Sequence, residues 1–328
     1  MYIGIDHSTT GVKTSLVSET GDRETFVIER SPENENEWSY VDLLSEHVDV
    51  DAIQMAAIGY SYGDNFGEIR PIETVENRGV VDNLGAGHPS GTGSKVFDDL
   101  QQSDIPTVAF PGVNHHIDCL HPYFSHYNTI TGADKVAMTR YAADQFTGDA
   151  NHFIAANASS SAMATLVYDG RLVGAFHWIG LVHGWAGLGS VRRVLHDEAD
   201  FSDIFMDSGI LRRSGYTFED VKETLDPELL EMVYFATLHN VYSLFAFANH
   251  VHDESLDGIA LSGRLSRLES PVDVQGKLRE SLGELAPVQH CSEFSTAAGA
   301  AMIARDVHVG KQDILGVPVK NSPRVQHP

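Results

Sequence analysis

The sequence predicts an α/β protein built of two related lobes. A strand–turn–strand–turn–strand pattern occurs twice, at Tyr2–Glu29 and at Phe153–Phe176, and predicted helices follow each copy. The chain has 328 residues, of which 42% are hydrophobic, so each lobe can bury a core. We expect the lobes to cover residues 1–147 and 148–328, with a cleft between them and the last helix packing back toward that cleft.

The first lobe begins with a short apolar strand, Tyr2–Asp6, which a hydroxyl-rich turn joins to the strand Val12–Val17. A turn ending in Gly21-Asp22 precedes the third strand, Glu24–Glu29. The remaining elements are expected in this order: helix Val41–His47, strand Ala52–Tyr60, helix Val96–Gln102, strand Ile105–Phe110 and a helix from Thr131 to about Phe146.

The second lobe repeats the meander. Phe153–Ala156 and Met163–Tyr168 read as strands, and Asp169-Gly170 is a typical hairpin turn before the return strand Arg171–Phe176. The elements expected after it are helices Phe218–Thr224, Pro227–Met232 and Tyr234–His250, the strand Gly258–Leu261 and a last helix, Thr296–Arg305.

The charge balance excludes several classes of partner. The chain holds 46 Asp and Glu against 22 Lys and Arg, a net charge of −24. Nucleic acids and anionic membranes need a basic surface, so neither is expected as a partner. The acids are dispersed along the chain, which favours adaptation to a salt-rich cytoplasm over a docking face for a basic protein. With two cysteines, no apolar run long enough for a membrane span and no signal-like N-terminus, we expect a soluble cytoplasmic protein.

The segment from Asp6 to Lys13, DHSTTGVK, has the composition of a phosphate site. An acid at the end of a buried strand can hold Mg²⁺, the turn hydroxyls of Thr9 and Thr10 can hold phosphate, and Lys13 can neutralise developing charge. The segment resembles the phosphate-1 motif of the sugar kinase, heat-shock-70 and actin superfamily, with Ser8 where that motif has glycine. A simple hydrogen-bonded hairpin is the alternative.

Two later segments resemble further motifs of the same superfamily. Asn157 to Ser161, NASSS, is similar to phosphate-2, whose first residue is normally Asp; Ser159 and Ser160 would contact phosphate there. An amide at Asn157 supplies no charge to Mg²⁺, which makes rapid ATP hydrolysis doubtful. The strand that ends in Ser262-Gly263 resembles the adenosine motif. The resemblance implies two actin-like, ribonuclease H-like lobes and a nucleotide cleft that binds ATP and Mg²⁺.

A closer resemblance is to the methanogenesis marker 12 family of archaea, which belongs to this superfamily. It covers most of residues 1–320 and implies a cellular context without a reaction. The segments that carry it are Gly4–Thr10, Tyr60–Asp64, Arg78–Val80, Gly85–Phe97, the Pro111-Gly112 loop, Tyr127 with the helix after it, Gly174–His183 and Ala304–Gly316.

Asp134 supports two interpretations. In the first, Thr131 caps the helix and Asp134 bonds back to it as in a capping box. In the second, the helix start Gly132-Ala-Asp-Lys135 resembles the G-A-D-R start of type III pantothenate kinases, which implies that Asp134 is the general base that activates an acceptor.

The roles of two loops are left undecided by the sequence. The glycine-rich stretch Gly85–Lys95 lacks Walker A spacing, although its helix start can hold an anion. The loop from His115 to His126 offers nitrogen, oxygen and sulfur ligands without a repeated metal spacing, and it either lines the acceptor site, binds a metal or only packs. The sequence does not decide whether His177, His183 and Trp185 line the cleft or only pack.

The preferred function is an ATP-dependent phosphotransferase or ATPase that acts on an unidentified acceptor. Asp6 and Asn157 would position Mg²⁺–ATP, with Asp6 as the metal-side carboxylate, and Lys13 and Asp134 would be catalytic. One alternative is a nucleotide-dependent assembly or binding protein without turnover, and another is a metal or cofactor chaperone. A homodimer is left open.

Overall fold

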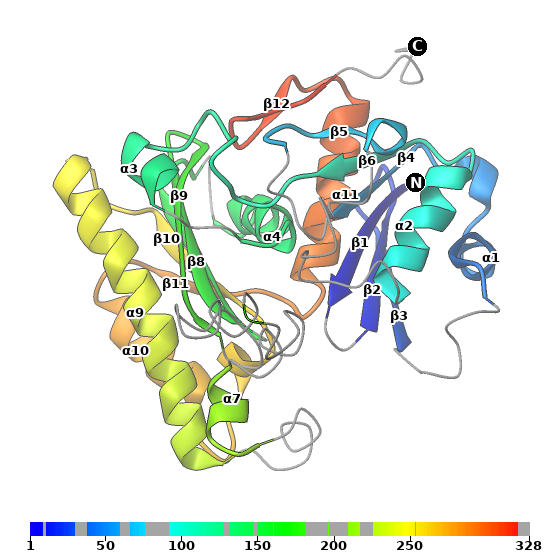
Figure 1. The fold of residues 1–328 in the computed structure, drawn as a ribbon. Coiled ribbons are helices and arrows are strands. Elements are labelled where there is room, and N and C mark those ends of the chain that lie inside the picture. The colour runs from blue at the N-terminus through cyan, green and yellow to red at the C-terminus, as the bar shows by residue number, and fades with distance from the viewer. Residues whose placement is uncertain are drawn as a thin grey trace. The chain divides into compact units, whose positions relative to one another are not determined.

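The computed structural model describes residues 1–8, 11–29, 38–59, 66–75, 92–127, 131–146, 150–159, 161–180, 196, 209–216, 226–252 and 254–320. The chain forms two compact units (Figure 1). The first combines Met1–Ala142 with Phe294–Pro328, and the second is Ala143–Glu293. Both are mixed α/β units with one main sheet each.

Among the described residues, the first unit has a six-stranded sheet in the order β3-β2-β1-β4-β6-β5. β1 is antiparallel to β2 and parallel to β4, and β4 is parallel to β6. The strands are β1 (Tyr2–Ser8), β2 (Gly11–Val17), β3 (Arg23–Glu29), β4 (Met55–Gly59), β5 (Arg70–Pro71) and β6 (Thr107–Phe110), and a small separate hairpin pairs β12 (Asp313–Ile314) with β13 (Val317–Pro318). The helices are α1 (Tyr40–Ser45), α2 (Thr92–Gln102), α3 (Pro122–His126), α4 (Asp134–Ala143) and α11 (Ser295–His308), with 3₁₀ turns at Val50–Ala52 and Ile72–Thr74.

Alternating residues of β1 explain how this sheet is covered. Ile3 and Ile5 belong to a core cluster with apolar side chains of α1 and α2. Gly4 points to the other face, where a Cβ would lie 1.9 Å from the backbone oxygen of Ala297 and 2.1 Å from the backbone nitrogen of Ala301. Only a residue without a side chain lets α11 lie directly on β1. The first sheet is therefore enclosed between α1 and α2 on one face and α11 on the other (Figure 1).

In the second unit the sheet order is β11-β10-β7-β8-β9, and β11, β10 and β7 run parallel. The strands are β7 (Phe153–Ala158), β8 (Ser161–Tyr168), β9 (Arg171–Gly180), β10 (Gly258–Ser262) and β11 (Val288–His290). The helices are α7 (Ile210–Arg213), α9 (Pro227–Val251) and α10 (Val274–Gly283), with a 3₁₀ turn at Leu265–Arg267. The long helix α9 packs across β7, β8 and β9, and α10 packs beside it (Figure 1).

The two sheets repeat one topology. An antiparallel meander is extended by two parallel strands, as β3-β2-β1-β4-β6 in the first unit and as β9-β8-β7-β10-β11 in the second. The repeated meander that the sequence predicts at Tyr2–Glu29 and Phe153–Phe176 is thus present in both units.

Two features differ from the sequence-based expectation. The chain divides after Ala142, and its C-terminal part from Phe294 belongs to the first unit, whereas the sequence placed all of residues 148–328 in the second lobe. The two helices expected at Pro227–Met232 and Tyr234–His250 are one helix, α9. Its start is fixed by Asp226, whose side chain accepts the N–H of Glu228 at 2.8 Å. The helix expected at Phe218–Thr224 lies outside the described residues.

No helix in the described ranges combines the length and the apolar character needed to cross a bilayer.

Candidate functional site

A carboxylate and an ammonium face each other across the first hairpin. Asp6 on β1 and Lys13 on β2 are directly opposed in the antiparallel register, so their side chains leave the same face of the sheet. The Lys13 ammonium also lies 5.6 Å from the ring centroid of Phe294, within reach of a cation–π contact. The residues at both ends of the predicted phosphate-1 segment are therefore brought together by β-pairing.

Asp6 carries a strongly perturbed carboxyl group. Burial and, to a smaller extent, the negative charge of Asp134 raise its pKa from 3.8 to about 7. The positive charges of Lys13 and Lys135 act in the opposite direction. Three charged groups from β2 and α4 thus act on Asp6 within the first unit. A carboxyl group with a pKa near neutrality is typical of functional sites.

Asp134 is the first residue of α4, and its carboxylate forms an ion pair with the ammonium of Lys135. The capping-box interpretation is not supported at this described helix start. The Thr131 hydroxyl donates to the Gly132 carbonyl at 3.5 Å, and the Asp134 carboxylate contacts Lys135 in place of the Thr131 backbone. Asp134 is 38% exposed while Lys135 is 7% exposed, so a nearly buried cation holds a solvent-accessible acid in place.

The start of α2 lies beside the end of β1. A Cβ at Gly93 would be 3.1 Å from the Cβ of His7, the residue after Asp6. The His7 ring in turn bonds through Nε2 to the carbonyl of Gly59 at 2.6 Å. These contacts place the N-terminus of α2, the end of the glycine-rich stretch, next to the Asp6 region. The larger part of that stretch, residues 85–91, lies outside the described residues.

Asn157 anchors the corresponding end of the second sheet. It is 5% exposed, and its side-chain oxygen accepts the Ser159 hydroxyl at 2.8 Å. In the parallel register of β7 and β10 it lies opposite Ser262, which is 3% exposed. The carboxyl ends of neighbouring parallel strands are where open α/β sheets bind ligands.

Gly263 directly follows β10 in a conformation that favours glycine, with φ of +94°. A Cβ there would lie 2.4 Å from the backbone oxygen of Ala158. The Ser266 hydroxyl closes the turn by donating to the carbonyls of Ser262 and Gly263, each at 2.9 Å. The absence of a side chain at Gly263 therefore lets the backbone after β10 lie directly against the end of β7.

Asp6 and Asn157 occupy equivalent positions in the repeated topology. Each is the fifth residue of the first strand of its meander. Asp6 is paired with Lys13 across the hairpin, whereas Asn157 is paired with Met163. The first unit therefore presents a carboxylate and a cation where the second presents an amide and a thioether. The charged chemistry is concentrated in the first unit.

Several predicted residues cannot be placed. Thr9, Thr10 and Ser160 lie outside the described residues, as do His183 and Trp185. His177 lies within β9, but nothing is described of its side chain.

The histidine-rich loop does not form a three-ligand cluster among the described residues. Cys119 is buried, and its thiol donates to the carbonyl of Leu315 at 3.6 Å. His121 caps α3 by accepting the N–H of Tyr123 through Nδ1 at 3.2 Å. His115 and His116 are exposed and lie ring to ring with centroids 4.0 Å apart. The sulfur and one imidazole of the loop thus serve packing and capping.

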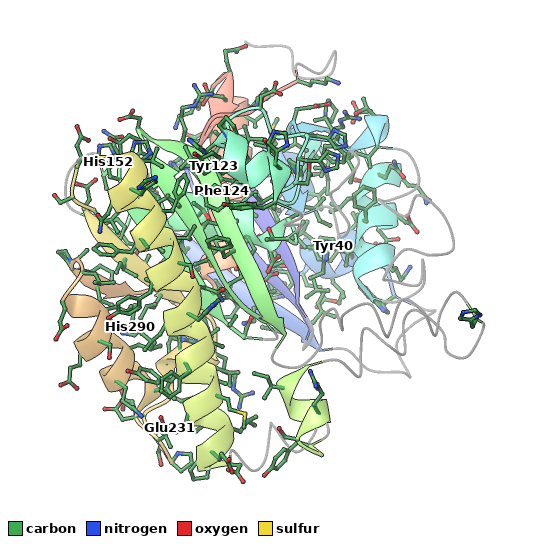
Figure 2. All side chains as sticks on the ribbon, turned by 60° about the vertical axis from the view of Figure 1, so that its left-hand side comes forward. Tyr40, Tyr123, Phe124, His152, Glu231 and His290 are labelled. Carbon is green, nitrogen blue, oxygen red and sulfur yellow. The ribbon has the colours of Figure 1, made fainter. Side chains whose placement is uncertain are left out.

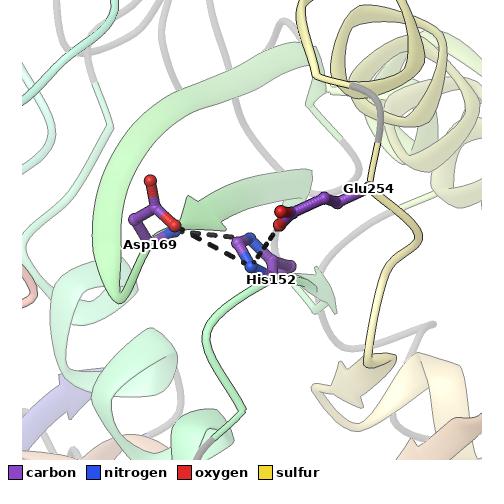
Figure 3. Close-up of side chains that lie close together, drawn as sticks. All are labelled: His152, Asp169 and Glu254. Carbon is purple, nitrogen blue, oxygen red and sulfur yellow. Dashed lines mark hydrogen bonds and ion pairs between the residues drawn. The ribbon is translucent and has the colours of Figure 1, made fainter.

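One cluster of metal-ligand type occurs elsewhere in the described chain, at His152, Asp169 and Glu254 (Figure 3). His152 Nε2 is 2.8 Å from a Glu254 oxygen and 3.8 Å from an Asp169 oxygen. The backbone N–H of Asp169 donates to Nδ1 at 3.4 Å, so the proton of the neutral ring is on Nε2, facing the carboxylates. A metal ion would have to displace that proton. The geometry is that of a hydrogen-bonded surface cluster.

Sequence reasoning missed Lys135 and Phe294. In the sequence Lys135 is only one residue of a predicted helix start. In the structure it is buried and forms an ion pair with Asp134 at the site. Phe294 precedes the alanine-rich helix α11 and reaches Lys13 only because that helix returns to β1. No local pattern links these positions.

Comparison with known proteins gives a family and a fold. No family model matches the chain. A UPF0285 protein from Methanothermobacter thermautotrophicus is 31% identical over 335 residues, which cover 98% of each chain. A second UPF0285 protein, from Methanocaldococcus jannaschii, is 29% identical over 330 residues, covering 97% of this chain and 98% of its own length.

Among solved structures, a propionate kinase from Francisella tularensis superposes with a TM-score of 0.57. It covers 91% of this chain and 98% of its own, at 14% sequence identity, so the likeness shows the fold alone. Together with the repeated sheet topology, it shows that the chain has the two-unit α/β fold of that kinase. By its full-length similarity to the Methanothermobacter protein, the chain belongs to the UPF0285 family, whose matched members come from methanogenic archaea.

Proposed function

We propose that the protein binds Mg²⁺–ATP and is a phosphotransferase or ATPase acting on an acceptor still to be identified. The observation that carries the proposal is the opposed pair of Asp6 and Lys13 with Asp134 and Lys135 acting on it. We further propose that it acts in the cytoplasm of a salt-adapted archaeon as a member of the methanogenesis marker 12 group, on the basis of the dispersed acidity and the quoted sequence segments.

The donor set around Asp6 fits a magnesium ion. Mg²⁺ prefers carboxylate oxygens and keeps most of its waters, so one or two protein acids beside substrate phosphates suffice. The charge of Asp134 raises the pKa of Asp6, which means that the two carboxylates repel each other. A divalent cation between an acid and a phosphate would relieve that repulsion. Asp6 is the proposed metal-side ligand.

Lys13 is proposed to stabilise negative charge on a transferred phosphoryl group. The two cations that act on Asp6 have different surroundings. Lys135 is 7% exposed and committed to Asp134, while Lys13 projects from the strand face that it shares with Asp6. A cation fixed near the phosphates needs no reorganisation during transfer. When bound, Mg²⁺–ATP would supply the phosphoryl group itself.

The second unit contains the residues that we propose bind the nucleotide. Asn157, Ser159 and Ser262 bring an amide and two hydroxyls to the ends of β7 and β10. Gly263 lies at the same strand ends, where its backbone packs directly against Ala158 without a side chain. We propose that these groups hold phosphate and adenosine, and that Thr9, Thr10 and Ser160 contribute phosphate contacts.

Asp134 is the proposed general base for the acceptor. Its carboxylate is accessible, sits at the start of α4 and makes neither of the helix-capping bonds that would give it a purely structural role. A positioned carboxylate of this kind contributes roughly 10²–10⁴-fold to a rate.

A nucleotide-dependent binding protein without turnover is the second candidate. It is favoured by the equivalent positions of Asp6 and Asn157, because the second unit lacks both the acid and the opposed cation of the first. In that case ATP would shift the protein between conformations without being consumed.

Single-turnover ADP formation separates the two candidates. We expect excess protein to convert labelled Mg²⁺–ATP to ADP slowly, and Asp134→Asn to bind ATP normally while forming ADP more slowly. Asp22→Asn is the matched control, since Asp22 is exposed in the turn between β2 and β3 and its carboxylate accepts the Thr20 hydroxyl. Stoichiometric ATP binding with no ADP formed by the wild-type protein would favour the non-catalytic candidate.

A further inference from the structure

One long helix surface is chemically unlike the rest of the chain. Charged residues make up 21% of the sequence, yet none of the 20 residues from Met232 to Val251 is Asp, Glu, Lys or Arg. This stretch is the greater part of α9, whose inner face packs on β7, β8 and β9. A helix that is apolar on its outer face as well is normally covered.

The outer face of α9 forms a regular stripe. Its large apolar members are Phe235, Tyr242 and Met232, which are 64%, 41% and 37% exposed. Leu238 and Phe245 flank them and are partly exposed. Between Met232 and Asn249 the exposed positions recur at intervals of three and four residues, as in helices that pack side by side. They are Met232, Phe235, His239, Tyr242, Ala246 and Asn249.

We propose that this stripe is the interface of a homodimer in which α9 packs antiparallel against α9 of a second copy. The large side chains of this face are self-complementary about a point between Leu238 and His239, as a twofold interface requires. When Phe235 of one copy lies beside Tyr242 of the other, Met232 lies beside the partly exposed Phe245. The acidic start of α9 at Glu228 then lies beside the C-terminal turn with His250, and the helix dipoles oppose each other.

The exposed area is in the range that a weak dimer needs. A large aromatic side chain can bury about 150–250 Å², so Phe235, Tyr242 and Met232 together leave about 300 Å² uncovered at their exposed fractions. Two copies double this to about 600 Å², to which the partly exposed flanking residues add, and weak complexes bury less than about 1,200 Å² in total. We expect a dimer that dissociates on dilution and that salt strengthens, because salt screens the repulsion between two chains of net charge −24.

A second copy fits this face better than a membrane does. A helix lying on a bilayer normally carries Lys or Arg along its polar edge. α9 carries none, and its charged residues are Glu228 and Glu231, the latter paired with Lys277 of α10 (Figure 2). Two copies of an uncharged stripe can pack against each other without Lys or Arg.

Sedimentation velocity in molar KCl over about a hundredfold range of protein concentration tests the proposal. We expect the wild-type protein to change from monomer to dimer, and Phe235→Glu to raise the dissociation constant about 100-fold or more. The matched control is Val309→Glu, since Val309 is 62% exposed at the end of α11 and far from the stripe in sequence; it should dimerise like the wild type. A wild-type protein that stays monomeric at every concentration, or that binds vesicles as a monomer, would overturn the proposal.

Disulfide cross-linking tests the register. The double variant Phe235→Cys with Tyr242→Cys should form a covalent dimer, since these positions adjoin across the proposed interface. Phe235→Cys alone should not, because the two copies of position 235 lie about 10 Å apart along the antiparallel helices. The native Cys119 and Cys291 are buried and give little background. Equal cross-linking of the single and double variants would contradict the antiparallel arrangement.

Discussion

Replacing Asp6 by Asn should make the protein more stable at alkaline pH while it impairs Mg²⁺–ATP binding. Burial, assisted by the charge of Asp134, raises the pKa of Asp6 from 3.8 to about 7. The folded protein therefore holds this proton more tightly than the unfolded chain does. By linkage, the contribution of Asp6 to stability is greatest in acid and falls as the pH rises from about 4 through 7.

The size of the effect follows from the shift. Each pKa unit corresponds to about 1.4 kcal/mol, so a rise of about three units costs at most about 4 kcal/mol at pH 8. Asp6 is partly accessible to solvent, which reduces the expected cost to about 2 kcal/mol. Asn is nearly isosteric and never ionises. Asp6→Asn should thus raise the free energy of unfolding by about 2 kcal/mol at pH 8 and leave it nearly unchanged at pH 4.

Urea unfolding of both proteins at pH 4 and pH 8, without nucleotide, measures this difference. Mg²⁺-dependent ATP binding is then measured at pH 8 for the same two proteins. The expected combination is higher stability with lost magnesium dependence, which is typical of a residue kept for function at a cost in stability. A variant that is equally destabilised at both pH values, with ATP binding unchanged, would show that Asp6 only supports the hairpin and would refute the reasoning.

Three further predictions concern other parts of the structure. Gly263→Ala should lower stability by about 1–3 kcal/mol more than Gly21→Ala and weaken ATP binding. Both glycines have φ near +90°, but only at Gly263 do backbone atoms occupy the place of a Cβ. Equal losses of the two variants in thermal unfolding would argue against this contact. Asn157→Asp should increase steady-state ATP hydrolysis by placing an acid at the position equivalent to Asp6, and an unchanged or lower rate would count against the phosphate-2 assignment. Asp306→Asn should cost about 3 kcal/mol in urea unfolding, since that buried carboxylate binds Arg140 at 2.7 Å and Lys311 at 3.0 Å; a loss below 1 kcal/mol would show that the network contributes little.

The repeated meander was predictable because its signals are local. Alternating and apolar runs bounded by turn residues mark β1 to β3 and β7 to β9, and the turn at Asp169-Gly170 has the left-handed conformations that its residues favour. Asp6 and Lys13 could be paired in advance for the same reason, since a short hairpin sets its own register. The fold class follows from these repeats.

The remaining features depend on contacts between distant segments. α11 joins the first unit because Gly4, nearly 300 residues earlier, lets it lie on β1, and no pattern within either segment reveals that match. The same packing brings Phe294 to Lys13. The high pKa of Asp6 arises from burial and from Asp134 on another element, so composition could suggest a metal ligand but not a carboxyl that titrates near neutrality.

Isothermal titration of the wild-type protein with Mg²⁺–ATP at pH 7, in buffers of different ionisation enthalpy, tests the central claim most directly. Because Asp6 has a pKa of about 7, it is about half protonated before binding, and a magnesium ion that needs its carboxylate must release that proton. The account predicts binding that requires Mg²⁺, releases about half a proton per ATP and loses this release in Asp6→Asn. Absence of any binding of ATP, ADP or GTP, with or without Mg²⁺, would contradict it.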